Sequence, residues 1–148
     1  MQIPFFEHIR DGERFLLAGC GGGYDIVAAI PLYRYLRQRG KTVILANLSF
    51  TRLEFTDCVE IVPGCYRVDE HSAGVPYFPE KFIHEWLSAR GESPVIYAFT
   101  KTLGVQSLRR AYQYLRKRYQ LDTLVLADGG TDSLMLGDET GTGTIVED

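Results

Sequence analysis

Four glycines fall within five residues directly after the first apolar stretch of the chain. They are Gly19, Gly21, Gly22 and Gly23, with Cys20 between the first two. Glycine lets a backbone approach a bound group closely, and free N–H groups near the start of a helix attract anions. A tight turn without a ligand needs fewer glycines, so we interpret this loop as an anion-facing loop that binds a small molecule. The alternative is a turn that contacts no ligand.

The glycine spacing matches only part of the dinucleotide-binding pattern. Gly19 and Gly21 fit its first two glycines, but Tyr24 stands where the third is expected. Asn47 ends the second apolar stretch, where that pattern has Asp or Glu, and it is a further candidate for ligand contact. The loop does not end in Gly-Lys-Ser or Gly-Lys-Thr, so it is not a P-loop. These features disfavour a nucleotide or dinucleotide without excluding one, and they favour a small anionic molecule.

A second group of reactive side chains follows the apolar stretch at residues 123–127. Its four carboxylates lie within twelve residues and are Asp128, Asp132, Asp138 and Glu139. Mg²⁺ and Mn²⁺ prefer oxygen ligands, and like charges this close are unfavourable unless a cation, a donor or a raised pKa compensates. We interpret all four as candidate metal ligands, and Asp128 and Asp132 also as a candidate catalytic acid and base. A solvated acidic turn is the alternative.

Several residues beside these two groups are candidates for a supporting role. Those of the acidic turn that could contact a ligand are Gly129, Gly130, Thr131 and Ser133. Asp25 either caps the first helix or binds a ligand, and capping is the favoured interpretation. Lys101 is expected to be a surface lysine, and Cys20 a packing residue, because no histidine motif supplies that thiol with a base.

The pattern of apolar residues predicts alternating strands and helices. Buried strands are expected at residues 14–18, 42–46, 94–99 and 123–127, with a shorter one at residues 58–62. Helices are expected at residues 25–39, 78–90 and 105–119. Pro31 either kinks the first helix or marks its true start. Residues 66–77 are expected to form a long loop, and the apolar face of the second helix is expected to be Phe82, Ile83, Trp86 and Leu87.

This alternation predicts one α/β domain over residues 1–148, with a three-layer Rossmann-like fold. We expect a mostly parallel sheet with helices on both faces. In such a sheet the ligand lies outside the carboxyl ends of the strands. The glycine loop, Asn47, Lys101 and the acidic turn all follow predicted strands, so we expect them to meet at one edge.

The composition excludes several other classes of protein. Hydrophobic residues make up 45% and charged residues 24% of 148 residues, which is ordinary for a folded domain. The formal net charge of −3 provides no basic field for nucleic acid, and no apolar run is long enough to cross a membrane. The three cysteines have no metal-ligand spacing, and the N-terminus lacks a signal-peptide pattern. We therefore expect a cytoplasmic protein with reduced thiols.

Residues 17–26 resemble the N-terminal signature of the family called domain of unknown function 1152. Three further segments resemble that family in the expected order, namely residues 78–80, residues 127–135, and residues 137–139 with the closing residues 143–144 and 147–148. The resemblance covers nearly the whole chain and implies no particular activity. Because members of that family are longer, it also implies that residues 1–148 are the N-terminal part of a longer protein.

The turn Asp-Gly-Gly-Thr-Asp at residues 128–132 is also similar to the Asp-Gly-Gly-Asn-Glu turn of D-glutamate cyclase-like proteins. That similarity implies a carboxylate or amino-acid substrate. The function we expect is therefore an enzyme that acts on a small anionic metabolite, with Mg²⁺ or Mn²⁺ as the candidate cofactor. The alternatives are a non-catalytic domain that binds a nucleotide or similar ligand and regulates a partner, and a structural domain whose glycines only make turns.

Overall fold

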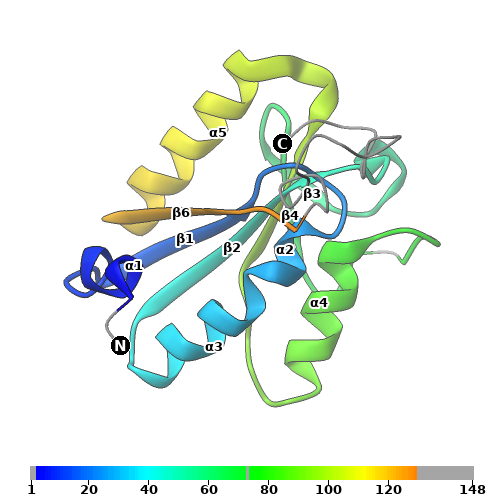
Figure 1. Ribbon diagram of the computed structural model, residues 1–148. Coiled ribbons are helices and arrows are strands. Elements are labelled where there is room, and N and C mark those ends of the chain that lie inside the picture. The colour runs from blue at the N-terminus through cyan, green and yellow to red at the C-terminus, as the bar shows by residue number, and fades with distance from the viewer. Residues whose placement is uncertain (1–2, 73, 130–148) are drawn as a thin grey trace, which may run out of the picture.

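The computed structural model describes residues 3–72 and 74–129, which form an α/β fold with one six-stranded sheet (Figure 1). The strands are β1 (Arg14–Gly19), β2 (Thr42–Ser49), β3 (Val59–Val62), β4 (Cys65–Val68), β5 (Ile96–Thr100) and β6 (Thr123–Ala127). Their order in the sheet is β3-β4-β5-β2-β1-β6. The strands β5, β2, β1 and β6 pair in parallel, whereas β4 is antiparallel to both of its neighbours. The sheet is therefore mixed and mostly parallel.

The helices cover both faces of this sheet (Figure 1). They are α1 (Pro4–His8), α2 (Asp25–Ala28), α3 (Ile30–Gln38), α4 (Pro79–Ser88) and α5 (Gly104–Tyr119), with 3₁₀ turns η1 (Leu53–Phe55) and η2 (Lys101–Leu103). Successive residues of a strand point to opposite faces. Phe15 and Leu17 accordingly join the core under α2, α3 and α4, while Leu16 and Ala18 join the core under α5. Burial on both faces explains why these strands read as continuous apolar runs.

The parallel register brings the predicted functional segments to one edge of the sheet. Gly19 pairs with Asn47 on β2 and with Ala127 on β6, so three strands end side by side. The strands β2 and β5 are also parallel, and Ser49 at the end of β2 pairs with Thr100 at the end of β5. Each loop that follows these strands therefore starts from the carboxyl edge.

Two expectations about individual elements need correction. The helix expected at residues 25–39 is two helices, α2 and α3, separated by Ala29. Pro31 lies in the first turn of α3, where its missing N–H has no intrahelical partner to lose. The loop expected at residues 66–77 contains most of β4, which forms a hairpin with β3 and pairs with β5. Only Cys65 and Val68 of this four-residue strand are buried, so its sequence lacks the apolar run of the parallel strands.

The buried face of α4 also differs from the expected one. Phe82 and Trp86 are each 41% exposed, although both are apolar. Ile83 and Leu87 are buried as expected, and the other buried residues of this helix are Pro79, Glu80, Lys81 and His84. Polar partners explain this difference, because Glu80 accepts a hydrogen bond from Asn47 and Lys81 donates to the backbone carbonyls of residues 69 and 70. No helix within the described residues is long and apolar enough to cross a membrane.

Shortening a side chain is expected to have different effects on a core strand and on an edge strand. Leu45 on β2 is fully buried, whereas Leu124 on the edge strand β6 is 52% exposed. Leu45→Ala is expected to lower the free energy of unfolding by about 2–5 kcal/mol because it leaves a cavity. Leu124→Ala, the matched control, is expected to cost less than about 1 kcal/mol. Urea denaturation measures both, and equal losses would contradict the arrangement of strands described here.

Candidate functional site

Asp25, two residues after the glycine loop, connects that loop to the start of the acidic turn at the carboxyl edge. The N–H of Cys20 donates to the carbonyl oxygen of Ala127 at 3.0 Å. The N–H of Gly129 donates to Asp25 Oδ1 at 3.2 Å. These contacts join the loop after β1 to the segment after β6, which are more than 100 residues apart in the sequence. The structure thus brings together part of what the sequence predicted to converge.

Asp25 is not a helix cap, which corrects the favoured interpretation from the sequence. It is the first residue of α2, and the preceding N-cap position, Tyr24, makes no side-chain capping hydrogen bond. The Asp25 carboxylate is 7% exposed and lies near the N–H groups of Gly21 and Gly22 as well as that of Gly129. Burial nevertheless outweighs these hydrogen bonds and raises the pKa of Asp25 above its ordinary value. Part of the anion-attracting backbone of the loop therefore already faces a carboxylate of the protein.

Two of the loop glycines have steric reasons to be glycine. A Cβ on Gly19 would collide with Asn47 Oδ1 and lie 2.6 Å from the backbone nitrogen of Ile26. Gly22 has a φ of +102°, a backbone conformation that other residues rarely adopt, and the ring of Phe50 covers it. The glycines therefore allow β1, β2 and α2 to meet closely.

Asn47 lies behind the loop and makes two internal hydrogen bonds. Its side chain is fully buried, and Nδ2 donates to the carbonyl oxygen of Gly23 at 2.8 Å. The same nitrogen donates to Glu80 Oε1 at 2.7 Å. The amide thus connects β2, the glycine loop and α4.

Glu80 is a residue of this site that the sequence did not single out from its residue type. It lies in the first turn of α4, a position where acidic residues are common, and the side chain is fully buried. Burial raises the pKa of Glu80, while hydrogen bonds from Asn47, from its own N–H and from Ser49 oppose that shift. The only earlier signal was its place in the segment at residues 78–80 that resembles the family.

Lys101 brings a positive charge to the same edge. It lies in η2, directly after β5, and its ammonium group is 4.6 Å from the centroid of the Phe50 ring. The same ring covers Gly22 of the loop. Lys101 is exposed, as expected from the sequence, but its position beside the loop also makes it available to an anionic ligand.

The structure covers only the beginning of the acidic turn. Asp128 and Gly129 belong to the described residues, and Asp128 raises the pKa of Asp25 through its charge. Within the described part of the chain, no three or more His, Cys, Asp or Glu side chains are arranged to hold a metal ion. The other predicted residues of this turn lie outside the described residues: Gly130, Thr131, Asp132, Ser133, Asp138 and Glu139.

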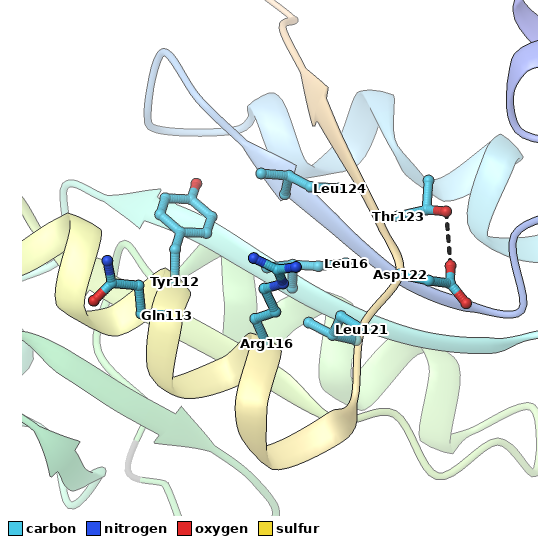
Figure 2. A pocket seen from close by; sticks show the side chains of 8 residues that line it. All are labelled: Leu16, Tyr112, Gln113, Arg116, Leu121, Asp122, Thr123 and Leu124. Atoms are coloured by element: carbon cyan, nitrogen blue, oxygen red, sulfur yellow. Dashed lines mark hydrogen bonds between the residues drawn. The ribbon is translucent and has the colours of Figure 1, made fainter.

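Among the cavities of the described residues, one lies beside the candidate site and another lies away from it. A groove of about 280 Å³ runs between α2, α3 and α4, and its lining includes Tyr24 and Pro79, the chain neighbours of Asp25 and Glu80. The other, of about 310 Å³, lies between α5 and the start of β6 (Figure 2). Figure 2 shows Leu124 facing this second cavity, which is away from the carboxyl edge and so takes no part in the candidate site.

The contact between Gly19 and Asn47 predicts a specific sensitivity to added volume. Gly19→Ala is expected to lower the free energy of unfolding by about 1–3 kcal/mol, because the new methyl group must displace Asn47 or α2. Gly74→Ala is the matched control, since a Cβ there meets no atom within 4 Å. This substitution is expected to change the free energy of unfolding by no more than about 0.5 kcal/mol. Urea denaturation distinguishes the two, and a neutral Gly19→Ala would contradict this packing.

Comparison with known proteins identifies the family of this chain. The family described as "Protein of unknown function (DUF1152)" matches residues 16–144, which include the glycine loop, Asn47, Glu80 and the acidic turn. A search of curated proteins found no match, and a search of solved structures found none. The family match covers most of the chain and agrees with the resemblance seen in its sequence motifs. The chain therefore belongs to the DUF1152 family.

Proposed function

We propose that the carboxyl edge of the sheet binds a small anionic metabolite and that the protein is an enzyme acting on it. The observation that carries this proposal is the hydrogen bond from the Gly129 N–H to Asp25 Oδ1 at 3.2 Å. Asp25 also lies near the N–H groups of Gly21 and Gly22, so this carboxylate connects the glycine loop to the start of the acidic turn, which supports a single ligand site at this edge. This edge is where ligands bind in a three-layer Rossmann-like fold, which is the arrangement we propose for the chain.

The anionic group of the ligand is best placed on the Lys101 side of the loop. The N–H groups of Gly21 and Gly22 act on Asp25, and the N–H of Cys20 donates to Ala127, so these groups have partners within the protein. Lys101 supplies a compact positive charge beside Phe50, next to the loop. A phosphate or carboxylate there would be held by the ammonium group and kept apart from the Asp25 carboxylate.

A divalent cation is the second component of the proposal. Asp128 begins the acidic turn, and Asp132, Asp138 and Glu139 would complete an oxygen ligand set for Mg²⁺ or Mn²⁺. Such a cation would offset the repulsion between carboxylates and help bind an anionic substrate. The alternative role for Asp128 and Asp132, without a cation, is to act as acid and base in the reaction.

Thermal unfolding of the full chain tests this proposal. Inorganic phosphate, glutamate, Mg²⁺ and Mn²⁺ serve as probes, singly and combined. A probe at 100 times its Kd is expected to stabilise the folded state by about 2.7 kcal/mol. Asp128→Asn should remove the stabilisation by metal, and Lys101→Met should remove the stabilisation by anion, because each deletes the charge that attracts that probe.

The matched control for Lys101 is Lys117, an exposed lysine on α5 away from this edge. Lys117→Met should leave every shift unchanged. Stabilisation by Mn²⁺ that survives Asp128→Asn, together with stabilisation by phosphate that survives Lys101→Met, would show that these probes bind elsewhere and would overturn the proposed site. Binding without turnover of any probe would favour a regulatory domain over an enzyme.

A further inference from the structure

The Asn47 amide uses both of its hydrogens inside the protein. One bond goes to the carbonyl oxygen of Gly23 at 2.8 Å and the other to Glu80 Oε1 at 2.7 Å. Asn47 and Glu80 are both fully buried, so water does not compete for either bond. The loop conformation at Gly23 is therefore linked through two buried hydrogen bonds to the first turn of α4.

Gly19 fixes the other side of the same amide. The oxygen Oδ1 of Asn47 lies against Gly19, where any Cβ would collide with it. The amide is thus confined between β1 on its oxygen side and the loop and α4 on its nitrogen side. An amide rotated by half a turn would present its oxygen to the carbonyl oxygen of Gly23, which can only accept, so Gly23 selects the observed orientation.

The Glu80 carboxyl group is not paired with a Lys or Arg side chain among the described residues. Its hydrogen bonds come from uncharged groups, namely Asn47, Ser49 and its own N–H. The nearby Lys81 donates instead to the carbonyls of residues 69 and 70. A buried carboxyl group in this setting favours its neutral form, and such groups are costly to retain without a role.

We propose that Glu80 and Asn47 are positioning residues for the ligand loop, in which Glu80 orients the Asn47 amide and the amide holds the Gly23 carbonyl from behind. This inference rests on the proposed function in one respect, namely that the glycine loop binds a ligand. Glu80 and Asn47 do not touch the ligand in this arrangement. They set the shape of the backbone that does, and the protonation of Glu80 is coupled to that shape.

Other titratable groups near Glu80 have separate effects. Tyr77 lies before α4, and its pKa is raised by burial and by the charges of Glu80 and Asp25. On α4 itself, burial lowers the pKa of His84. From β2, Asn47 and Ser49 face the carboxyl group and carry no charge. Comparing the wild type with a Glu80 variant therefore shows how much of any pH dependence requires the Glu80 carboxyl group.

Hydrogen exchange measured by NMR on the full chain, without ligand, tests the inference. The reporter is the Asp25 amide, which donates to the carbonyl oxygen of Gly22 in the loop, and the reference is the Thr100 amide, which donates to Gly64. Glu80→Leu is expected to lower the protection factor of the Asp25 amide about tenfold, because Asn47 loses its acceptor. The Thr100 amide should keep its protection.

Two further variants separate positioning from simple stability. Glu80→Gln keeps an oxygen that can accept a hydrogen bond from Asn47. At neutral pH it should therefore restore the protection of the Asp25 amide that Glu80→Leu loses. Glu85→Gln, a change to an exposed glutamate of the same helix, is the matched control and should have no effect. Equal losses at Asp25 and Thr100 in Glu80→Leu, or no loss at Asp25, would overturn the inference.

The pH profile decides the question if Glu80→Leu does not fold. A carboxyl group with a raised pKa in the folded state stabilises that state most at low pH, and this contribution is lost as pH rises from the ordinary value of 4.5 through the raised one. Loop protection, corrected for intrinsic exchange, should fall over that range more in the wild type than in Glu80→Gln. Identical profiles would contradict the inference, whereas failure of every ligand probe to bind the wild type would contradict only the proposed function.

Discussion

The close approach of Asn47 to Gly19 is the constraint on which this edge of the sheet depends. Because Gly19 has no side chain, the Asn47 amide can lie against β1 and the start of α2 can pack on the same point. That placement brings Asp25 toward the end of β6, where it accepts a hydrogen bond from Gly129. One missing side chain thus allows three strand ends and two helices to share a small region.

Carboxyl groups, rather than basic groups, dominate the buried part of this region. Asp25 and Glu80 are both buried, and burial raises the pKa of each despite hydrogen bonds to their oxygens. Buried acidic groups with raised pKa values are common at functional sites. The Asp25 carboxylate also lies where an external anion was expected, which moves the proposed anion site toward Lys101.

Sequence patterns predicted the features that depend on apolar runs and glycines. The strand at residues 123–127 coincides with β6, and the loops after β1, β2, β5 and β6 start from one edge as expected. Predictions from the sequence failed where tertiary contacts override the local preference of the residues. The face of α4 could not be inferred, because Asn47 binds Glu80 from a strand 33 residues away. Similarly, the position of Asp25 suggested a cap, but its partner is Gly129, which is distant in the sequence.

The central claim is that the glycine loop and the acidic turn form one site, and paramagnetic broadening by Mn²⁺ tests it most directly. In NMR spectra of the full chain, substoichiometric Mn²⁺ should broaden the amide signals of Gly21, Gly22 and Gly129 together. The amides of Gly40 and Gly91, which lie after α3 and α4, should stay sharp. Broadening of the loop without Gly129, of Gly129 without the loop, or of neither would contradict a shared site.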